Sequence, residues 1–267
     1  MRRAVDRRSL AVRREPADRV SALVEFREAS YRIGTREILK SLTLSIESGE
    51  TVVLLGRSGS GKTTALKMVN GLLFPSAGEV LVDGKPTTAW DPVRLKRRIG
   101  YVIQEIGLFP HYTVAENIGL VPQLEGWDGL RIRRRVEALL DQVGLAPEQF
   151  AARFPRQLSG GQRQRVGVAR ALAADPSVLL FDEPFGALDP VTRLDLQKQF
   201  LGLRRDFGKT AIFVTHDVRE ALMLANRIAL LRNGALELVA PPLEFLDSLG
   251  PEARAFLACL DWNVEAP

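Results

Sequence analysis

The chain has little of what would place it outside a reducing, aqueous compartment. Cys259 is the single cysteine among 267 residues, so no internal disulfide can form. No apolar run approaches the roughly 18 to 20 residues that a membrane helix needs, and the first twenty residues lack the apolar core of a secretory signal. There is no Cys/His cluster to predict a structural metal. We therefore expect a protein that remains inside the cell and has no membrane span of its own.

The positive charge is concentrated at the amino terminus. Residues 1–20 carry seven arginines against Asp6, Glu15 and Asp18, which accounts for four of the five net positive charges of the chain. An arm of this kind could contact phosphates or anionic lipid. Its charges follow no pattern, however, which is typical of a disordered, solvated leader. We expect residues 1–20 to be such a leader, and we expect no nucleic-acid binding.

A glycine-rich stretch is the first feature that indicates chemistry. Residues 56–63 read GRSGSGKT, after the apolar run 51–55 and before a helical pattern at 64–70. Glycines let successive backbone N–H groups converge on an anion, and the following helix adds the positive end of its dipole. The stretch therefore predicts a phosphate-binding loop. In such a loop Lys62 reaches the β and γ phosphates and the Thr63 hydroxyl coordinates Mg²⁺.

The surrounding patterns predict an α/β fold. Residues 20–29 and 42–46 alternate apolar and polar side chains as half-buried antiparallel strands do, and Tyr31 falls in the predicted loop between them, where its ring could stack on a nucleobase. Gln104 ends a predicted strand at 99–103, and its amide could hold water or Mg²⁺. Strands and helices that alternate after residue 177 predict a parallel sheet covered on both faces. From residue 114 to residue 174 the signals are helical, at 114–120, 130–143, 149–152 and 162–174.

Two further segments carry candidate functional residues. Residues 178–184, VLLFDEP, read as a buried strand that ends in two carboxylates, at the edge where parallel sheets bind ligands. Asp182 suits Mg²⁺, while Glu183 points elsewhere and can act as a general base or orient water. Residues 158–162, LSGGQ, open a helix with Ser159 as N-cap, which makes a second anion site. One nucleotide does not need two such sites in one chain, but two chains packed head to tail would use both.

Together these segments resemble the nucleotide-binding subunits of ABC transporters. Residues 56–63 are similar to that family's Walker A motif, residues 178–183 to its Walker B motif and residues 158–162 to its signature motif. Four shorter segments also match, namely the adenine-stacking position (Tyr31), the Q-loop (Gln104), the D-loop (Ala187 to Asp189) and the H-loop (Thr215 to Asp217). The resemblance implies a P-loop NTPase fold with a mixed sheet core, an antiparallel β subdomain and an inserted helical subdomain. It assigns the ATPase domain to residues 21–240, with the helical subdomain at about 114–174, and a short helical extension to 241–267.

The resemblance also implies an ATPase that uses ATP and Mg²⁺. Glu183, His216 and Gln104 would act in catalysis. Thr63, Gln104 and Asp182 would hold the metal. The residues implied to contact nucleotide, in this copy or across the dimer, are Tyr31, Gly56, Ser58, Gly59, Ser60, Gly61, Lys62, Thr63, Thr64, Ser159, Gly160, Gly161, Gln162 and Asp189.

The implied partners follow from the same family. They are a second copy of the chain in a head-to-tail dimer, transmembrane permease subunits, and a separate or fused substrate-binding protein. We expect the permease to dock beside residues 104–112, with Phe109 and Tyr112 as contacts. The expected location is the cytoplasmic face of the plasma membrane, as a peripheral protein.

Residues 67–70, 101–118 and 181–190 resemble more specifically the ATPases of osmoprotectant importers, which take up glycine betaine, choline or carnitine. Many of those carry a C-terminal pair of CBS domains. Since the chain stops at Pro267, we expect no such domains and no osmotic sensing through them. Arg57 stands where proline is commoner, and we expect little effect because that position contributes mainly backbone.

Three alternatives remain open at the level of sequence. The solute could be an amino acid or another small molecule, because no motif forms a pocket for an amine. A soluble ABC ATPase that acts on nucleic acid or ribosomes is a second reading, although such proteins usually have tandem ATPase domains or a long coiled-coil insertion. A P-loop kinase or switch GTPase is the third, and it has no use for residues 158–162.

Overall fold

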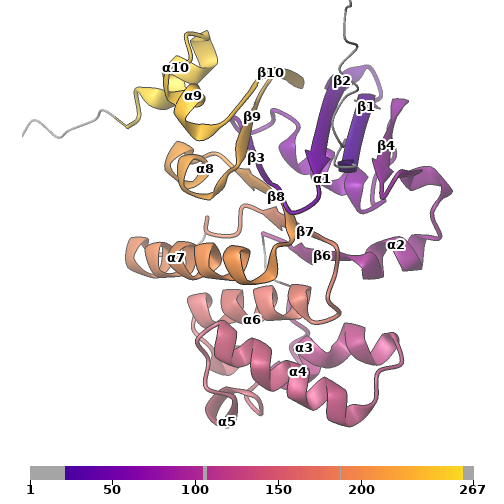
Figure 1. Ribbon diagram of the computed structural model, residues 1–267, viewed down its shortest axis with the longest axis vertical. Coiled ribbons are helices and arrows are strands. Elements are labelled where there is room, and N and C mark those ends of the chain that lie inside the picture. Colours follow the sequence, from indigo (N-terminus) through magenta and orange to yellow (C-terminus); the bar gives the residue numbers. More distant parts are fainter. Residues whose placement is uncertain (1–21, 105–106, 187, 261–267) are drawn as a thin grey trace, which may run out of the picture.

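The computed structural model describes residues 22–104, 107–186 and 188–260, with residues 203–207 described by backbone alone. The described chain forms two β-sheets and a set of helices arranged in layers (Figure 1). The leader expected over residues 1–20 lies outside the described residues. Within the described part, no helix combines the length and apolar character needed to cross a membrane.

The central sheet is mixed, as predicted. It has six strands in the order β10-β9-β3-β8-β7-β6, and every neighbouring pair is parallel except β9 with β10. The strands are β3 (Thr51–Leu55), β6 (Ile99–Val102), β7 (Val178–Asp182), β8 (Thr210–Thr215), β9 (Arg227–Arg232) and β10 (Ala235–Ala240).

The inner strands β3, β7 and β8 are buried along their whole length and mostly apolar, because both faces of the sheet are covered. Along β3, Val53 packs into the apolar cluster that includes the helices after β6, whereas Val52 and Leu54 pack into the cluster that includes α1 (Lys62–Val69). All three side chains are fully buried. Alternate side chains of one strand therefore build two separate cores, one on each side of the sheet.

The second sheet is antiparallel, with the strand order β2-β1-β4-β5. Its strands are β1 (Ala22–Ile33), β2 (Arg36–Glu47), β4 (Ala77–Val82) and β5 (Lys85–Pro86). The first two are longer than predicted, so the placement of Tyr31 in a loop is wrong: Tyr31 lies within β1, opposite Leu39. Register shifts on either side of Ala29, together with left-handed backbone at Glu28 and Ser41, interrupt the alternation of apolar residues. This irregularity hid the continuation of β1 beyond Ala29 from a pattern-based prediction.

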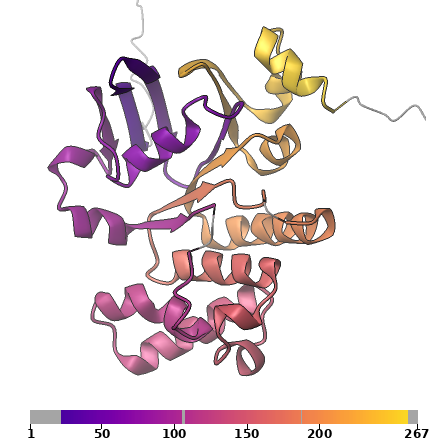
Figure 2. The same cartoon turned by 180° about the vertical axis from the view of Figure 1, so that it is seen from behind.

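Four helices separate β6 from β7, and we call them the helical lobe. They are α3 (Val114–Leu124), α4 (Gly129–Gln142), α5 (Pro147–Phe150) and α6 (Gly160–Leu172), with a 3₁₀ turn at Pro155–Gln157. Figures 1 and 2 show the lobe on one side of the central sheet and α1 on the other. A reciprocal capping box between Thr113 and Glu116 starts α3, which runs four residues beyond its predicted end at residue 120 and includes Pro122.

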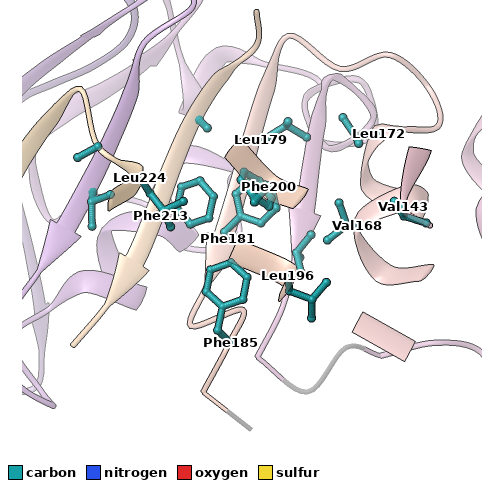
Figure 3. Close-up of a cluster of buried hydrophobic side chains, with 14 of the residues drawn as sticks. Val143, Val168, Leu172, Leu179, Phe181, Phe185, Leu196, Phe200, Phe213 and Leu224 are labelled. Carbon is teal, nitrogen blue, oxygen red and sulfur yellow. The ribbon is translucent and has the colours of Figure 1, made fainter. Parts of the chain in front are cut away.

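Phenylalanines hold the sheet to the helix that follows β7. Phe181 and Phe213 stack with ring centroids 4.3 Å apart, and Phe200 meets both edge-on (Figure 3). Phe200 belongs to α7 (Pro190–Phe207), whereas the stacked pair comes from β7 and β8. Large rings in these geometries add about 1 kcal/mol per pair beyond the area they bury, so this cluster fixes α7 firmly on the sheet.

The remaining helices pack against different parts of the two sheets. They are the 3₁₀ turn Thr87–Ala89, α2 (Pro92–Arg98), α8 (Val218–Leu224), α9 (Pro242–Leu246) and α10 (Pro251–Leu257). Asp91 caps α2 as predicted, by accepting from the Arg94 N–H at 2.8 Å. The two short helices predicted near the carboxyl end are present, and Phe245 and Phe256 anchor them in the main core.

We expect Gly100→Ala to lower the free energy of unfolding by about 2 kcal/mol, because the β6 backbone lies against α6 without room for a methyl group. A Cβ at Gly100 would meet the Ala171 carbonyl oxygen, and it would lie 2.7 Å from Leu179 Cδ2. Gly202→Ala in α7 is the matched control. Its added Cβ would meet nothing within 4 Å, so we expect it to leave stability equal or slightly raised. Urea titration decides between them, and equal stability of the two variants would contradict the packing argument.

Candidate functional site

The predicted phosphate-binding loop connects β3 to α1, and its glycines are required by its shape. Gly59 and Gly61 have φ angles of +78° and +99°, a region that side chains with a Cβ rarely adopt. A Cβ at Gly56 would collide with the Leu231 carbonyl oxygen and would lie 2.6 Å from Ser60 Oγ. Ser58 and Gly59 form the exposed apex of the loop. Exposed N–H groups next to a helix start make this a site suited to an anion.

Lys62 places its charge inside this loop. Its ammonium donates to the carbonyl oxygens of Gly56 at 2.7 Å and Arg57 at 3.0 Å. Burial lowers the pKa of Lys62, and the carboxylates of Glu183 and Asp182 oppose that shift. The site therefore holds one buried cation at the base of the loop, with two acids close enough to stabilise it.

Thr63 and Asp182 meet beside the lysine. The Thr63 hydroxyl donates to Asp182 Oδ1 at 2.8 Å, which joins the first turn of α1 to the end of β7. Tyr101 on β6 donates to the other carboxylate oxygen at 3.3 Å. Burial, followed by the nearby Asp182 charge, raises the pKa of Tyr101. The structure thus brings two of the three predicted metal ligands together, and it adds Tyr101, which the sequence analysis missed.

Glu183 turns away from Asp182 and faces His216. Its backbone is left-handed, with a φ of +45°, and its N–H donates to the Val214 carbonyl of β8 at 3.0 Å. The carboxylate Oε2 lies 3.2 Å from His216 Nδ1. Left-handed backbone at a residue other than glycine costs on the order of 1 kcal/mol, so the surrounding chain must hold it there. The predicted base and the predicted histidine are therefore direct neighbours.

A buried acid supports the turn that carries His216. Thr215 donates its hydroxyl to Glu220 Oε2 and accepts from the Asp217 N–H at 3.0 Å. Gln197 on α7 donates to the other oxygen of Glu220 at 3.1 Å. The sequence analysis missed Glu220. The available signal was an acid on the apolar face of α8, between Val218 and Leu224, where a charge has to be satisfied by hydrogen bonds.

Gln104 is not brought into this cluster by a hydrogen bond. It is exposed, two residues beyond the last residue of β6, and within the described chain its side chain makes no hydrogen bond. Residues 105 and 106, which follow it, lie outside the described residues. The position is nevertheless close along the chain to Tyr101, which contacts Asp182.

The helix start that was predicted as a second anion site has the predicted cap. Ser159 Oγ accepts from the Gln162 N–H at 3.2 Å, and Gln162 Oε1 accepts from the Ser159 N–H at 2.9 Å, so the predicted N-cap is part of a full capping box. Gly160 starts α6. A Cβ at Gly161 would lie 2.5 Å from Thr192 Cγ2 of α7. Figures 1 and 2 show α6 in the helical lobe and α1 on the other side of the sheet, so the helices that follow the two predicted anion sites lie on different sides of the sheet.

Three other predicted site residues have visible structural roles. Tyr31 packs partly buried against the core on the α1 side. Asp189 accepts from the Thr192 N–H at 3.0 Å at the start of α7, and hydrogen bonds from Thr192 lower the pKa of Asp189. Thr64 is half-buried in α1. Ala187, the first residue of the predicted D-loop, lies outside the described residues.

The buried position of Glu220 makes a pH-dependent prediction. Burial raises the pKa of Glu220 in the folded chain. The stability this group contributes is therefore present below its unfolded pKa and is lost as pH rises through the folded value. We expect the stability of Glu220→Gln, measured relative to the unsubstituted chain by urea unfolding, to increase from pH 5 to pH 8. Glu137→Gln, at an exposed position of α4, should show no such trend, and a flat difference for Glu220→Gln would refute the expectation.

Curated relatives match most of this chain. It is 50% identical over 213 residues to the glycine betaine/carnitine/choline transport ATP-binding protein OpuCA of Bacillus subtilis (strain 168), a match that covers 80% of this chain and 56% of the relative. The chain thus spans about half the length of that protein. It is 48% identical over 224 residues to the glycine betaine uptake system ATP-binding protein YehX of Escherichia coli (strain K12), covering 84% of this chain and 72% of the relative.

A solved structure and a family model agree with these matches. The dimeric post-hydrolysis structure of the ATP-binding cassette MJ0796 bound to ADP and Pi superposes with a TM-score of 0.73 at 36% identity, and it covers 82% of this chain and 98% of that one. The predicted ATPase fold is confirmed by this likeness. The sequence model described as ABC transporter matches residues 39–186, more than half of the chain. From the site geometry, the fold and these matches together, the chain belongs to the ABC transporter family.

Proposed function

We propose that this chain is the ATP-binding and ATP-hydrolysing subunit that energises an ABC importer of osmoprotectants such as glycine betaine, carnitine or choline. The observation that carries the proposal is the meeting of two pairs, Thr63 with Asp182 and Glu183 with His216, beside the lysine of the phosphate loop. These groups come from the ends of two neighbouring strands, β7 and β8, and from α1, the helix that follows β3. A structural salt-bridge network would not need an exposed anion cradle at the same place.

The residues present fit ATP with Mg²⁺. The loop from Gly56 to Thr64 would bind the phosphates through backbone N–H groups, with Tyr31 stacking on adenine. Thr63 and Asp182 offer hard oxygen ligands, and Gln104 would add an amide oxygen. The described residues contain no group of three or more His, Cys, Asp or Glu side chains that could hold a metal alone, which suits an ion shared with phosphate. Bound Mg²⁺ would supply positive charge to the phosphate oxygens.

Glu183 and His216 would act on the attacking water. The Glu183 carboxylate would accept its proton or orient it, which is the task of a general base. His216 is 58% exposed and its Nδ1 lies 3.2 Å from one carboxylate oxygen of Glu183, so its other ring nitrogen would be the one to contact a γ-phosphate. The Thr215–Glu220 hydrogen bond would keep the histidine in place while nucleotide exchanges.

A second copy would complete each site. Because α6, which the Ser159 cap begins, and α1, which follows the phosphate loop, lie on opposite sides of one sheet, we infer that an anion held by both helix starts would need two chains. We infer a head-to-tail dimer in which residues 159–162 of one copy, with Asp189, face the nucleotide of the other. The dimeric MJ0796 cassette with ADP and Pi supports this arrangement. The match to ATP-binding subunits named for glycine betaine uptake supports the solute class, with another small solute as the alternative.

An aromatic cluster on the surface supports a permease contact. Phe109, His111 and Tyr112 pack together just before α3, with ring centroids 4.5 to 6.1 Å apart. Phe109 is 41% exposed and lies on a cavity of about 330 Å³ between β6 and the helical lobe. Exposed aromatic side chains beside a groove are suited to receive a partner's helix. With permease and substrate-binding protein as partners, the chain would lie on the cytoplasmic face of the membrane.

Glu183→Gln tests the ATPase and the dimer together. We expect hydrolysis to fall by on the order of 10² to 10⁴-fold, because the amide cannot accept the water's proton. Mg-ATP should then hold the variant as a dimer, which light scattering after gel filtration measures. Glu137→Gln, at an exposed position of α4, is the control and should hydrolyse ATP like the unsubstituted chain. A Glu183→Gln protein that stays monomeric in saturating Mg-ATP would count against the proposed dimer.

Phe109→Ala tests the coupling to a permease. We expect uptake of labelled glycine betaine to be lost in proteoliposomes that contain the permease encoded beside this subunit, while ATPase activity without permease stays within about twofold, since Phe109 contacts none of the catalytic groups. Leu124→Ala is the control, because Leu124 is also exposed but lies at the far end of α3. Loss of basal hydrolysis in Phe109→Ala would show that the cluster serves the ATPase instead. Uptake of a different solute would redirect the assignment to another importer.

A further inference from the structure

The phosphate loop is tied to the carboxyl-terminal helix α10 by a side chain. Arg57 Nε donates to Glu252 Oε1 at 2.6 Å, and the two residues are 195 positions apart. The Arg57 side chain is 69% exposed, whereas that of Glu252 is 8% exposed. The expectation that position 57 contributes mainly backbone did not include this side-chain contact. The contact joins the part of the loop that binds an anion to an element that carries no motif of the family.

Glu252 is a fixed anchor for this contact. It lies in the first turn of α10, next to Ala253 and near Phe256, both of which are buried in the main core. Its N–H donates to Glu237 Oε1 of β10 at 3.3 Å. Arg232 at the end of β9 lies 3.9 Å from the second carboxylate oxygen of Glu252. A buried carboxylate held in this way keeps one orientation, so it restrains the arginine rather than following it.

The restrained arginine lies at the start of the glycine-rich part of the loop. Between Gly56 and Lys62, two glycines have left-handed backbone, which gives this stretch a large conformational entropy to lose. The Arg57 carbonyl accepts from Lys62 Nζ at 3.0 Å and from the Ser60 N–H at 3.2 Å. The position of Arg57 thus sets the first turn of the loop and the place of the lysine.

The described side chains of residues 57–61 offer no second tether of this kind. Ser58 is exposed, and Ser60 Oγ is buried with no hydrogen-bond partner in the described chain. Arg57 and Glu252 also form part of the wall of a cavity of about 360 Å³, which residues 58–60 and 231–233 complete. The ion pair therefore holds the Arg57 guanidinium against the Glu252 carboxylate in the wall of this cavity.

We propose that Arg57 is a positioning residue for nucleotide and that Glu252 holds it, so that α10 preorganises the phosphate loop for Mg-ATP. The inference rests on the proposed function of this loop as an ATP site. Preorganisation improves binding by reducing the entropy that the loop loses when the ligand arrives. The ion pair makes no contact with the Glu183 and His216 groups, so it acts on nucleotide affinity and not on the hydrolysis step.

The test is a double-mutant cycle on the full chain, with Arg57→Gln, Glu252→Gln and the double variant. We expect each single variant to raise the Kd for Mg-ATP about fivefold, as loss of one charged hydrogen bond predicts, while kcat stays within about twofold. The double variant should bind no worse than either single variant, because both remove the same contact. Arg57→Lys, which keeps the charge, should restore part of the affinity.

Arg254→Gln is the matched control. Arg254 is exposed on the same helix, α10, and lies outside both the phosphate loop and the Arg57–Glu252 pair, so its substitution should leave the Kd unchanged. Glu252→Gln leaves no buried charge unpaired, and its thermal unfolding midpoint confirms that the chain is folded. It therefore carries the test even if Arg57→Gln folds poorly. Titration with a fluorescent ATP analogue gives Kd, and steady-state hydrolysis gives kcat.

The inference would be overturned by an unchanged Kd in both single variants, by additive losses in the double variant, or by an equal loss in Arg254→Gln. An effect on kcat with unaltered Kd would also reject it, because it would place Arg57 in the hydrolysis step. Failure of the proposed function looks different: the unsubstituted chain would then not bind Mg-ATP at all.

Discussion

The register between β3, β8 and β7 places the charged groups of the site. Leu55, the last residue before the phosphate loop, pairs with Thr215, and Val214 pairs with Asp182. Because these strands are parallel and fully buried, their carboxyl ends meet at one edge. A slip of one residue would turn each apolar side chain to the wrong face, so the two cores also fix where the acids and His216 lie.

Three groups at this edge of the sheet are held in states that lower the local stability. Lys62 is buried with a lowered pKa, Glu220 is buried with a raised one, and Glu183 has left-handed backbone. Each of these features is unfavourable alone. Hydrogen bonds that cross between elements offset them, and the stacked phenylalanines of β7 and β8 hold the strands that carry them. Strained and buried polar groups gathered at one place are what physical chemistry expects at a reactive site.

Much of the fold and site could be predicted from sequence because the motifs are short and local. Each motif determines its local structure within a few residues. The motifs are the glycine-rich loop, the strand that ends in two acids and the Ser–x–x–Gln helix cap. The extra length of β1 could not be predicted, since register shifts interrupted its alternation near Ala29. The pair Arg57 with Glu252 could not be found either, because nothing local marks two residues that meet only after α10 docks. Glu220 could have been found as a charged residue at an apolar position of α8, but its hydrogen-bond partner Gln197 could not.

The cap of α6 has one more consequence. A carboxylate would stabilise this helix start as well as the hydroxyl of Ser159 does, so folding alone would accept aspartate there. The serine oxygen already accepts the Gln162 N–H, and its hydroxyl can still donate one hydrogen bond. An uncharged cap with a spare hydrogen-bond donor can bind an anion, whereas an acidic cap would repel it electrostatically. Serine at position 159 is therefore compatible with an anion binding at the start of α6, whereas aspartate would only cap the helix.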